Sequence, residues 1–265
     1  MIRDITIGQY YAGNSVIHEL DPRTKLMGAL VYIITLFLVK NPWWYILCLA
    51  AVLILYRLAQ VPLSYFLKGL KGIIILLLFT FIFRLIATPG TLLYHWGIIS
   101  VTEEGVIKAI GMTLRIALMI VGASLLSYTS TPRELADGLE KSLSFLEKIH
   151  IPIQDMAVIT MIAFRFIPIM IEELNVLMDA QAARGAEFKK CSFVKKCKNL
   201  FSILIPLFLS TVRRASDLAM AMEARGYTGE KQTSRMYPLI YGKNDKLAYV
   251  VIFLFFCFFL FLLFI

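Results

Sequence analysis

Charged side chains are scarce in this sequence. Asp, Glu, Lys and Arg make up 17% of its 265 residues, against about 25% in ordinary soluble domains. Hydrophobic residues make up 59%, and the mean hydropathy is +0.75. A soluble domain of this size cannot bury so much apolar surface, and a disordered chain needs low hydrophobicity. Both classes are excluded, and the composition predicts an integral membrane protein.

Cysteine and histidine are also few, with four and three copies. Cys48 and Cys257 lie in apolar runs, where each is expected to behave as a small hydrophobic residue. Cys191 and Cys197 flank a group of lysines and have no histidine near them in the sequence. A zinc site or a disulfide framework needs a fuller set of residues. We therefore predict no metal site in this chain.

Sequence motifs for nucleotide binding and catalysis are missing as well. A phosphate-binding loop needs Gly-x-x-x-x-Gly-Lys-Ser/Thr after a strand, and the nearest stretch, residues 226–233, has the wrong spacing. Paired catalytic carboxylates and a nucleophile elbow are also missing. We therefore expect that the chain is not an enzyme and holds no cofactor. It is expected to receive energy from another protein. The net charge of +9 is read as an orientation signal of a membrane protein, and no nucleic-acid partner is predicted.

About five apolar segments are predicted to cross the bilayer, which needs roughly 20 residues per helix. They are residues 25–40, 43–60, 68–87, 104–128 and 246–265. The connection between the second and third carries Arg57, Lys68 and Lys71, whereas residues 88–103 contain no Lys or Arg. Basic residues favour the cytoplasmic side. This places the N-terminus in the cytoplasm and the C-terminus outside the cell membrane.

Two arginines lie within the predicted spans. An arginine at the centre of a membrane helix costs about 2.5–3.5 kcal/mol on insertion scales. Arg84 is close to the outer end of its span and is expected to reach the interface. Arg115 is deeper and is expected to face a partner or the interior of the bundle. A structural role is favoured over substrate binding for both.

Residues 130–245 are predicted to form a cytoplasmic unit, between residues 1–129 with four spans and the last span at 246–265. A short amphipathic helix starts at Ser130-Thr131-Pro132, and long helices follow at residues 153–184 and 197–225. Each long helix begins with an apolar half that is too short to span, and each contains a proline that should bend it. If both crossed the membrane, the lysine-rich loop between them would lie outside, against the positive-inside rule. They are expected to lie at the cytoplasmic surface and to cross through small residues. These are Ala180, Ala182, Ala183, Ala215, Ser216, Ala219 and Ala221.

The two long helices end alike. The first ends in Ala183-Arg184-Gly185 and the second in Ala224-Arg225-Gly226, 41 residues later. Glycine ends helices because it adopts the left-handed conformation readily, and the small alanine leaves the arginine clear. One such end is an ordinary helix terminus. Two on matching helices indicate two similar receiving grooves on a partner, as a dimer would offer.

These motifs resemble the transmembrane T component of energy-coupling factor (ECF) importers of vitamins and metals. The resemblance covers nearly the whole chain and rests on five stretches. They are residues 18–26, residues 131–135 with Gly138-Leu139, residues 165–168 with Glu172-Glu173, residues 183–185 and residues 221–227. The paired Ala-Arg-Gly ends are the most specific of these.

The resemblance implies an all-α membrane protein with a coupling unit of one short and two long crossing helices. It implies that two ABC-type ATPases bind the helix ends through Ala183, Arg184, Gly185, Ala224, Arg225 and Gly226. ATP and magnesium would be bound by those ATPases. A separate membrane S component, or several in turn, would bind the vitamin or metal.

Two other readings stay open. An ordinary ABC importer permease lines its own path and has one coupling loop, which Glu223-Ala224-Arg225-Gly226 matches only in part. A secondary transporter favours inverted repeats and broken helices with polar residues in mid-membrane. Neither feature is apparent among the predicted spans.

Overall fold

The computed structural model describes residues 10–11, 13–39, 41–96, 99–149, 152–186, 193–229 and 239–264. They fall into two units, which we treat separately. One unit comprises Gly8–Ser142 and Leu239–Ile265, and we call it the bundle. The other contains Leu143–Pro238, and we call it the long-helix pair.

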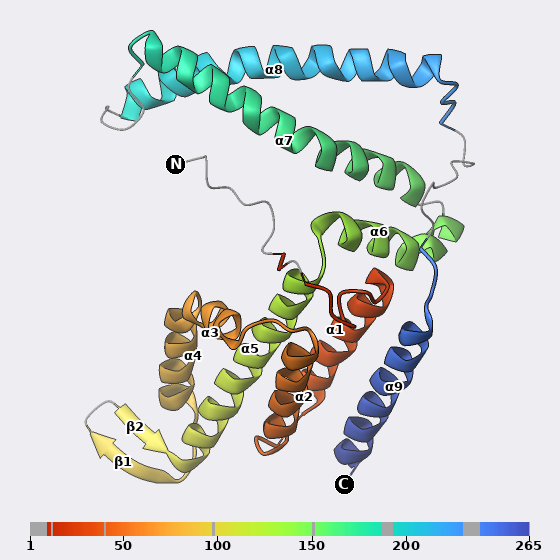
Figure 1. The fold of residues 1–265 in the computed structure, drawn as a ribbon. Helices are drawn as coiled ribbons and strands as arrows, with labels where there is room; N and C mark the ends of the chain where they lie inside the picture. The colour runs from red at the N-terminus through yellow and green to blue at the C-terminus, as the bar shows by residue number, and fades with distance from the viewer. Residues whose placement is uncertain are drawn as a thin grey trace. The chain divides into compact units, whose positions relative to one another are not determined.

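Four helices build the core of the bundle (Figure 1): α1 (Pro22–Leu38), α2 (Trp44–Leu58), α5 (Glu103–Thr129) and α9 (Lys243–Phe264). Their buried side chains form one cluster that includes Tyr32, Leu36, Cys48, Val52, Tyr56, Leu118, Val121, Leu125 and Phe259. Cys48 is fully buried there, as expected for a small hydrophobic residue. The four helices match four of the predicted spans to within a few residues.

The span predicted at residues 68–87 is not one helix. It is divided into α3 (Leu63–Lys71) and α4 (Ile74–Ala87), which meet at an angle of 60°. Gly72 lies at the break, and Lys68 and Lys71 lie on the α3 side of it. Lysines are unfavourable in the hydrocarbon layer and glycine weakens a helix. The continuous helix that hydropathy alone suggested is therefore interrupted here.

Residues 88–103, expected to be an external loop, contain a short hairpin. Strand β1 (Leu92–Trp96) pairs antiparallel with β2 (Ile99–Thr102), with His95 opposite Ser100. Tyr, Trp, Ile and Val are common in strands, but the stretch is too short for its alternation to be clear in the sequence. The hairpin is a small addition to a helical protein.

The described residues contain two helices, α5 and α9, that are long and apolar enough to cross a membrane. The bent pair α3–α4 would make a third if it acts as one span. With 17 and 15 residues, α1 and α2 are shorter than an ordinary span. Large apolar side chains such as Ile75, Phe83 and Phe253 are more than half exposed. The prediction of an all-α membrane protein is confirmed, and the number of five spans stays a prediction.

Arg115 of α5 has partners inside the bundle. Its Nε donates a hydrogen bond to Tyr45 Oη at 2.8 Å, and its terminal nitrogen donates to the Val39 carbonyl at 2.8 Å. Val39 is the residue at which α1 ends, so the guanidinium completes a carbonyl that the helix leaves unpaired. The expected structural role of Arg115 fits these contacts. Arg84 lies exposed in the last turn of α4.

The long-helix pair consists of the 3₁₀ turn η1 (Ser144–Ile149), α7 (Ile153–Ala183) and α8 (Phe193–Ala224). Both long helices were predicted, and α8 starts four residues earlier than expected. They contact each other where Thr211 Oγ1 lies 3.3 Å from Met170 Sδ and Arg214 forms an ion pair with Glu173 at 3.2 Å. Both helices continue through Pro168 and Pro206.

The expected crossing through small residues is wrong. All seven of those residues are exposed, so they do not form a close helix contact. The contact uses longer side chains nearer the middle of each helix, since Met170 and Arg214 can bridge a wider separation than alanine can. The alanines near each helix end remain exposed instead.

Packing in the bundle makes Gly122 of α5 a sensitive position. A Cβ there would lie 2.5 Å from Tyr32 Cε1 of α1. We expect Gly122→Ala to lower the free energy of unfolding by about 1–3 kcal/mol, the usual cost of overpacking. Gly111→Ala in the same helix is the control, because its Cβ would meet atoms only at 3.8 and 3.9 Å. Denaturant titration in detergent measures both, and equal stability of the two variants would contradict this packing.

Candidate functional site

The end of α7 is closed by the backbone. Ala186 N–H donates to the Gln181 carbonyl at 3.0 Å, and Gly185 N–H donates to the Ala182 carbonyl at 2.9 Å. Gly185 has φ of +84°, the left-handed conformation that favours glycine. These are the two bonds of a Schellman motif. The predicted C-cap role of Gly185 is confirmed.

The end of α8 repeats this arrangement. Tyr227 N–H donates to the Met222 carbonyl at 3.0 Å, and Gly226 N–H donates to the Glu223 carbonyl at 2.9 Å. Gly226 has φ of +77°. A Cβ added to Gly185 or Gly226 would have no atom within 4 Å. The space around each turn is open, so glycine is required by the backbone conformation and not by a close neighbour.

Arg184 and Arg225 are exposed at these two ends, together with the alanine before and the glycine after each arginine. Among the described residues, neither guanidinium has a hydrogen-bond or ion-pair partner. Each presents five N–H donors in a planar fork. Carboxylates and backbone carbonyls are the groups that such a fork binds best. The structure brings Ala183, Arg184 and Gly185 together at one end, and Ala224, Arg225 and Gly226 together at the other.

The two Arg-Gly ends lie at opposite ends of the long-helix pair, because α7 and α8 run in opposite directions (Figure 1). A helix of 32 residues such as α8 is about 48 Å long at 1.5 Å per residue. The two ends are thus two separate contact points and not one composite site. The residues between the helices, 187–192, lie outside the described residues, and with them Lys189, Lys190 and Cys191.

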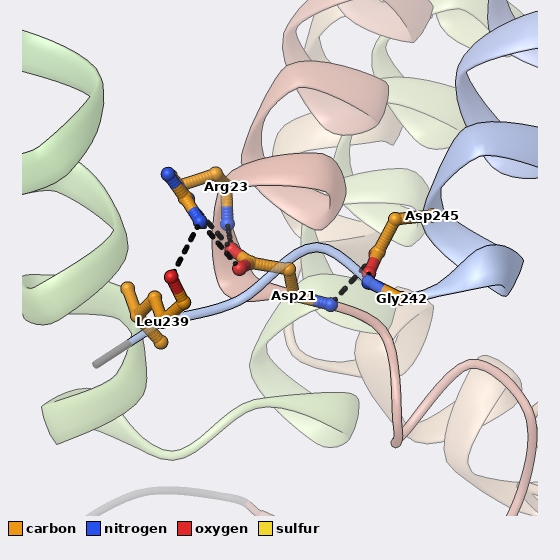
Figure 2. Close-up of polar contacts among 5 residues, drawn as sticks. All are labelled: Asp21, Arg23, Leu239, Gly242 and Asp245. Atoms are coloured by element: carbon orange, nitrogen blue, oxygen red, sulfur yellow. Dashed lines mark hydrogen bonds and ion pairs between the residues drawn. The ribbon is translucent and has the colours of Figure 1, made fainter. Parts of the chain in front are cut away.

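A second polar feature of the bundle was not predicted from the sequence. Asp21 caps α1 and forms an ion pair with Arg23 at 2.8 Å. The backbone N–H of Asp21 donates to Asp245 Oδ1 at 2.8 Å, and that of Gly242 donates to Asp245 Oδ2 at 2.7 Å (Figure 2). Arg23 also donates to the Leu239 carbonyl at 3.2 Å. The start of α1 is therefore joined to the chain that leads into α9.

The same turn is joined to the end of α5. Lys25 Nζ donates to the His18 and Thr129 carbonyls, each at 2.9 Å. Tyr11 N–H donates to the Tyr128 carbonyl at 2.9 Å. Asp21, Lys25 and Asp245 are all less than 9% exposed. Buried charges need such partners, and the signals in the sequence for this cluster were the charged groups next to an apolar span and the motif at residues 18–26.

The short helix α6 (Pro132–Leu143) follows directly. Thr131 and Glu134 form a reciprocal capping box, in which each side chain accepts from the other residue's backbone N–H at 3.2 Å. The helix start predicted at Ser130-Thr131-Pro132 is confirmed. The α-helix ends at Leu143 and is followed by the 3₁₀ turn η1.

The described residues contain no group of three or more His, Cys, Asp or Glu that could hold a metal ion. Two exposed cationic helix ends lie on the long-helix pair, and a polar cluster joins α1, α5 and α9 of the bundle.

Comparison with known proteins now bears on this arrangement. The family model described as CbiQ, cobalt transport protein, matches residues 13–235. The chain belongs to the CbiQ family. The match includes the α1 side of the polar cluster, residues 21–25, and both Arg-Gly ends, and it stops before Leu239 and Asp245.

Similar relatives carry the name energy-coupling factor transporter transmembrane protein EcfT. The protein of Acidaminococcus fermentans is 42% identical over 256 residues, which cover 97% of this chain and 96% of the relative. That of Clostridium kluyveri is 44% identical, covering 94% and 93%. That of Lactococcus lactis is 37% identical, covering 95% of each. The CbiQ-family chain is therefore a membrane transport protein, as its ECF-like motifs predicted.

The left-handed conformation of Gly185 makes the Schellman end of α7 testable by substitution. An alanine in this conformation costs about 1–2 kcal/mol, so we expect Gly185→Ala to increase opening of the α7 end. Hydrogen exchange of the Ala186 amide should rise about 5–30-fold. Gly185→Asn is the control, since asparagine tolerates this conformation better. Equal protection in the glycine and alanine proteins would contradict the Schellman end.

The polar cluster gives a prediction about pH. Burial of Asp21 opposes ionisation, but its hydrogen bonds with Arg23 and the nearby positive charges outweigh burial and lower the pKa of its carboxyl. The folded pKa is then below the unfolded value of about 3.9. The resulting stability is present above about pH 4 and is lost as the pH falls through the folded pKa.

We expect wild type to be more stable than Asp21→Asn at pH 6 and expect the difference to shrink at pH 3. Denaturant midpoints in detergent at the two pH values measure this. A difference that stays constant from pH 6 to pH 3 would show that the carboxylate charge is not responsible.

Proposed function

We propose that this chain is the transmembrane coupling subunit of an ECF-type ABC importer. The observation that carries the proposal is the pair of matching Arg-Gly ends on one two-helix unit. Each end is closed by the same Schellman hydrogen bonds. Each also has an exposed alanine and an exposed arginine that has no partner among the described residues. Two equal contact points suit two ATPase subunits, either identical or closely similar.

In this proposal, the α7 end enters a groove of one ATPase and the α8 end enters a groove of the other. Arg184 and Arg225 would bind carboxylates or backbone carbonyls there. The partner ATPases bind ATP and magnesium and supply the energy. The long helices act as levers, and the Glu173–Arg214 ion pair and the Met170–Thr211 contact join them so that they move together.

The membrane partner is an S component that binds the transported vitamin or metal. Apolar side chains on α7 and α8, including Met156, Met161, Ile205 and Phe208, are exposed. Methionine-rich surfaces adapt to more than one partner, which supports a subunit shared by several S components. The long helices and the N-terminus would lie on the cytoplasmic side of the cell membrane, as the positive-inside rule suggests.

Two observations make the alternatives weaker. An ordinary ABC permease subunit presents one coupling loop, whereas this chain has two equivalent ends. A secondary transporter would place unpaired polar groups at a substrate site in mid-membrane. Here Arg115, the charged residue deepest in a predicted span, already donates hydrogen bonds to the Tyr45 hydroxyl and the Val39 carbonyl.

The direct test reverses the charge at each end. We expect Arg184→Glu or Arg225→Glu to weaken ATPase binding about tenfold or more, because arginine anchors in an interface are commonly worth 2 kcal/mol or more. The double variant should abolish uptake while still inserting in the membrane. ATPase recovery in a mild-detergent pull-down and substrate uptake measure the two effects.

Arg213→Glu is the matched control, since Arg213 is exposed on α8 away from its end. It should recover the ATPases at the level of the wild type. If the double variant retained uptake, the assignment of the two ends would be wrong.

A further inference from the structure

From residue 10 onward, where the structure describes the chain, it passes between the bundle and the long-helix pair twice, after Ser142 and before Leu239. On the bundle side, the segments next to both passages are held by the same short stretch, residues 21–26. We call this stretch the anchor turn. It includes Asp21, which caps α1, and the first residues of the helix, and its contacts at the second passage are drawn in Figure 2.

The second passage is held at three points. Arg23 donates a hydrogen bond at 3.2 Å to the carbonyl of Leu239, which is the first residue on the bundle side of this passage. The centre of its guanidinium lies 3.9 Å from the centroid of the Tyr241 ring. The Asp21 N–H donates to Asp245 at 2.8 Å. The chain is therefore fixed from the point where it enters the bundle to the first turn of α9.

The first passage is held by close packing. A Cβ added to Gly138 of α6 would lie 2.8 Å from Pro22 Cβ and 3.1 Å from Leu26 Cδ1. Only glycine lets α6 approach the anchor turn this closely. Lys25 adds a bond to the Thr129 carbonyl, just before α6. The two segments of the bundle that lead to the long helices therefore both contact the anchor turn.

We infer that the anchor turn is the point through which motion of α7 and α8 reaches the bundle, with Asp21, Arg23 and Asp245 as positioning residues. The inference rests on the proposed function. A loose connection would absorb a displacement of the long helices, whereas two connections fixed to one helix start pass it to α1 and its neighbours. The residues of the anchor turn touch neither ATP nor the transported substrate in this account.

The first test loosens the anchor turn with Arg23→Lys. Lysine keeps the charge, but its single ammonium cannot replace the fork that joins Asp21 and Leu239 while it lies over Tyr241. We expect normal recovery of both ATPases and continued ATP hydrolysis in the complex, with uptake per ATP hydrolysed lowered about fivefold or more. Arg57→Lys is the control, because Arg57 is exposed on α2 and its side chain has no partner among the described residues.

The outcomes separate a positioning role from a merely structural one. If assembly and uptake fell in equal proportion, or if uptake per ATP were unchanged, the inference would be overturned. Loss of ATPase binding in this variant would do the same, since Arg184 and Arg225 are intact. The charge reversals at those two residues test the proposed function independently of this result.

A second variant decides the matter if Arg23→Lys is not recovered in the membrane. Asp245→Asn keeps the size of the side chain and one acceptor oxygen, but its NH2 group cannot accept a hydrogen bond from the Asp21 or Gly242 N–H. We expect it to lower uptake per ATP hydrolysed as Arg23→Lys does, with normal recovery of both ATPases. Unchanged uptake per ATP in a complex recovered at the wild-type level would overturn the inference.

Discussion

A helix leaves its last backbone carbonyl groups without partners, and these must be satisfied in some other way. The structure solves this problem differently in its two units. In the bundle, basic side chains do it: Lys25 donates to the Thr129 carbonyl at the end of α5, and Arg115 donates to the Val39 carbonyl at the end of α1. In the long-helix pair, a left-handed glycine lets the backbone close on itself. This difference decides which basic side chains are free to bind a partner.

The two solutions have opposite consequences for the basic residues nearby. A cation that completes a helix end inside the bundle is occupied and at least partly buried, so it is unavailable to a partner. At α7 and α8 the Schellman bonds complete the carbonyls, so Arg184 and Arg225 are left exposed. In the proposed function both arginines are available because they are unoccupied, and the open space around Gly185 and Gly226 would give a partner access to them.

The sequence was informative where local rules decide the structure. Hydropathy located α1, α2, α5 and α9, the pattern Thr131-Pro132-Arg133-Glu134 located the start of α6, and Arg-Gly located two helix ends. It was uninformative where distant residues decide. Asp21 and Asp245 are 224 positions apart, and no local pattern joins them. The crossing through Met170 and Arg214 also depends on packing that hydropathy and residue size do not reveal, whereas the break at Gly72 lies beside two lysines that the apolar residues of this segment outweighed.

In the proposed complex, one copy of this chain holds two ATPases through two equivalent helix ends. Native mass spectrometry of the complex, purified through a tag on this chain in mild detergent, tests it most directly. We expect a particle with one copy of this chain, two ATPase subunits and one small membrane protein. A particle with a single ATPase, or this chain without any ATPase partner, would contradict it.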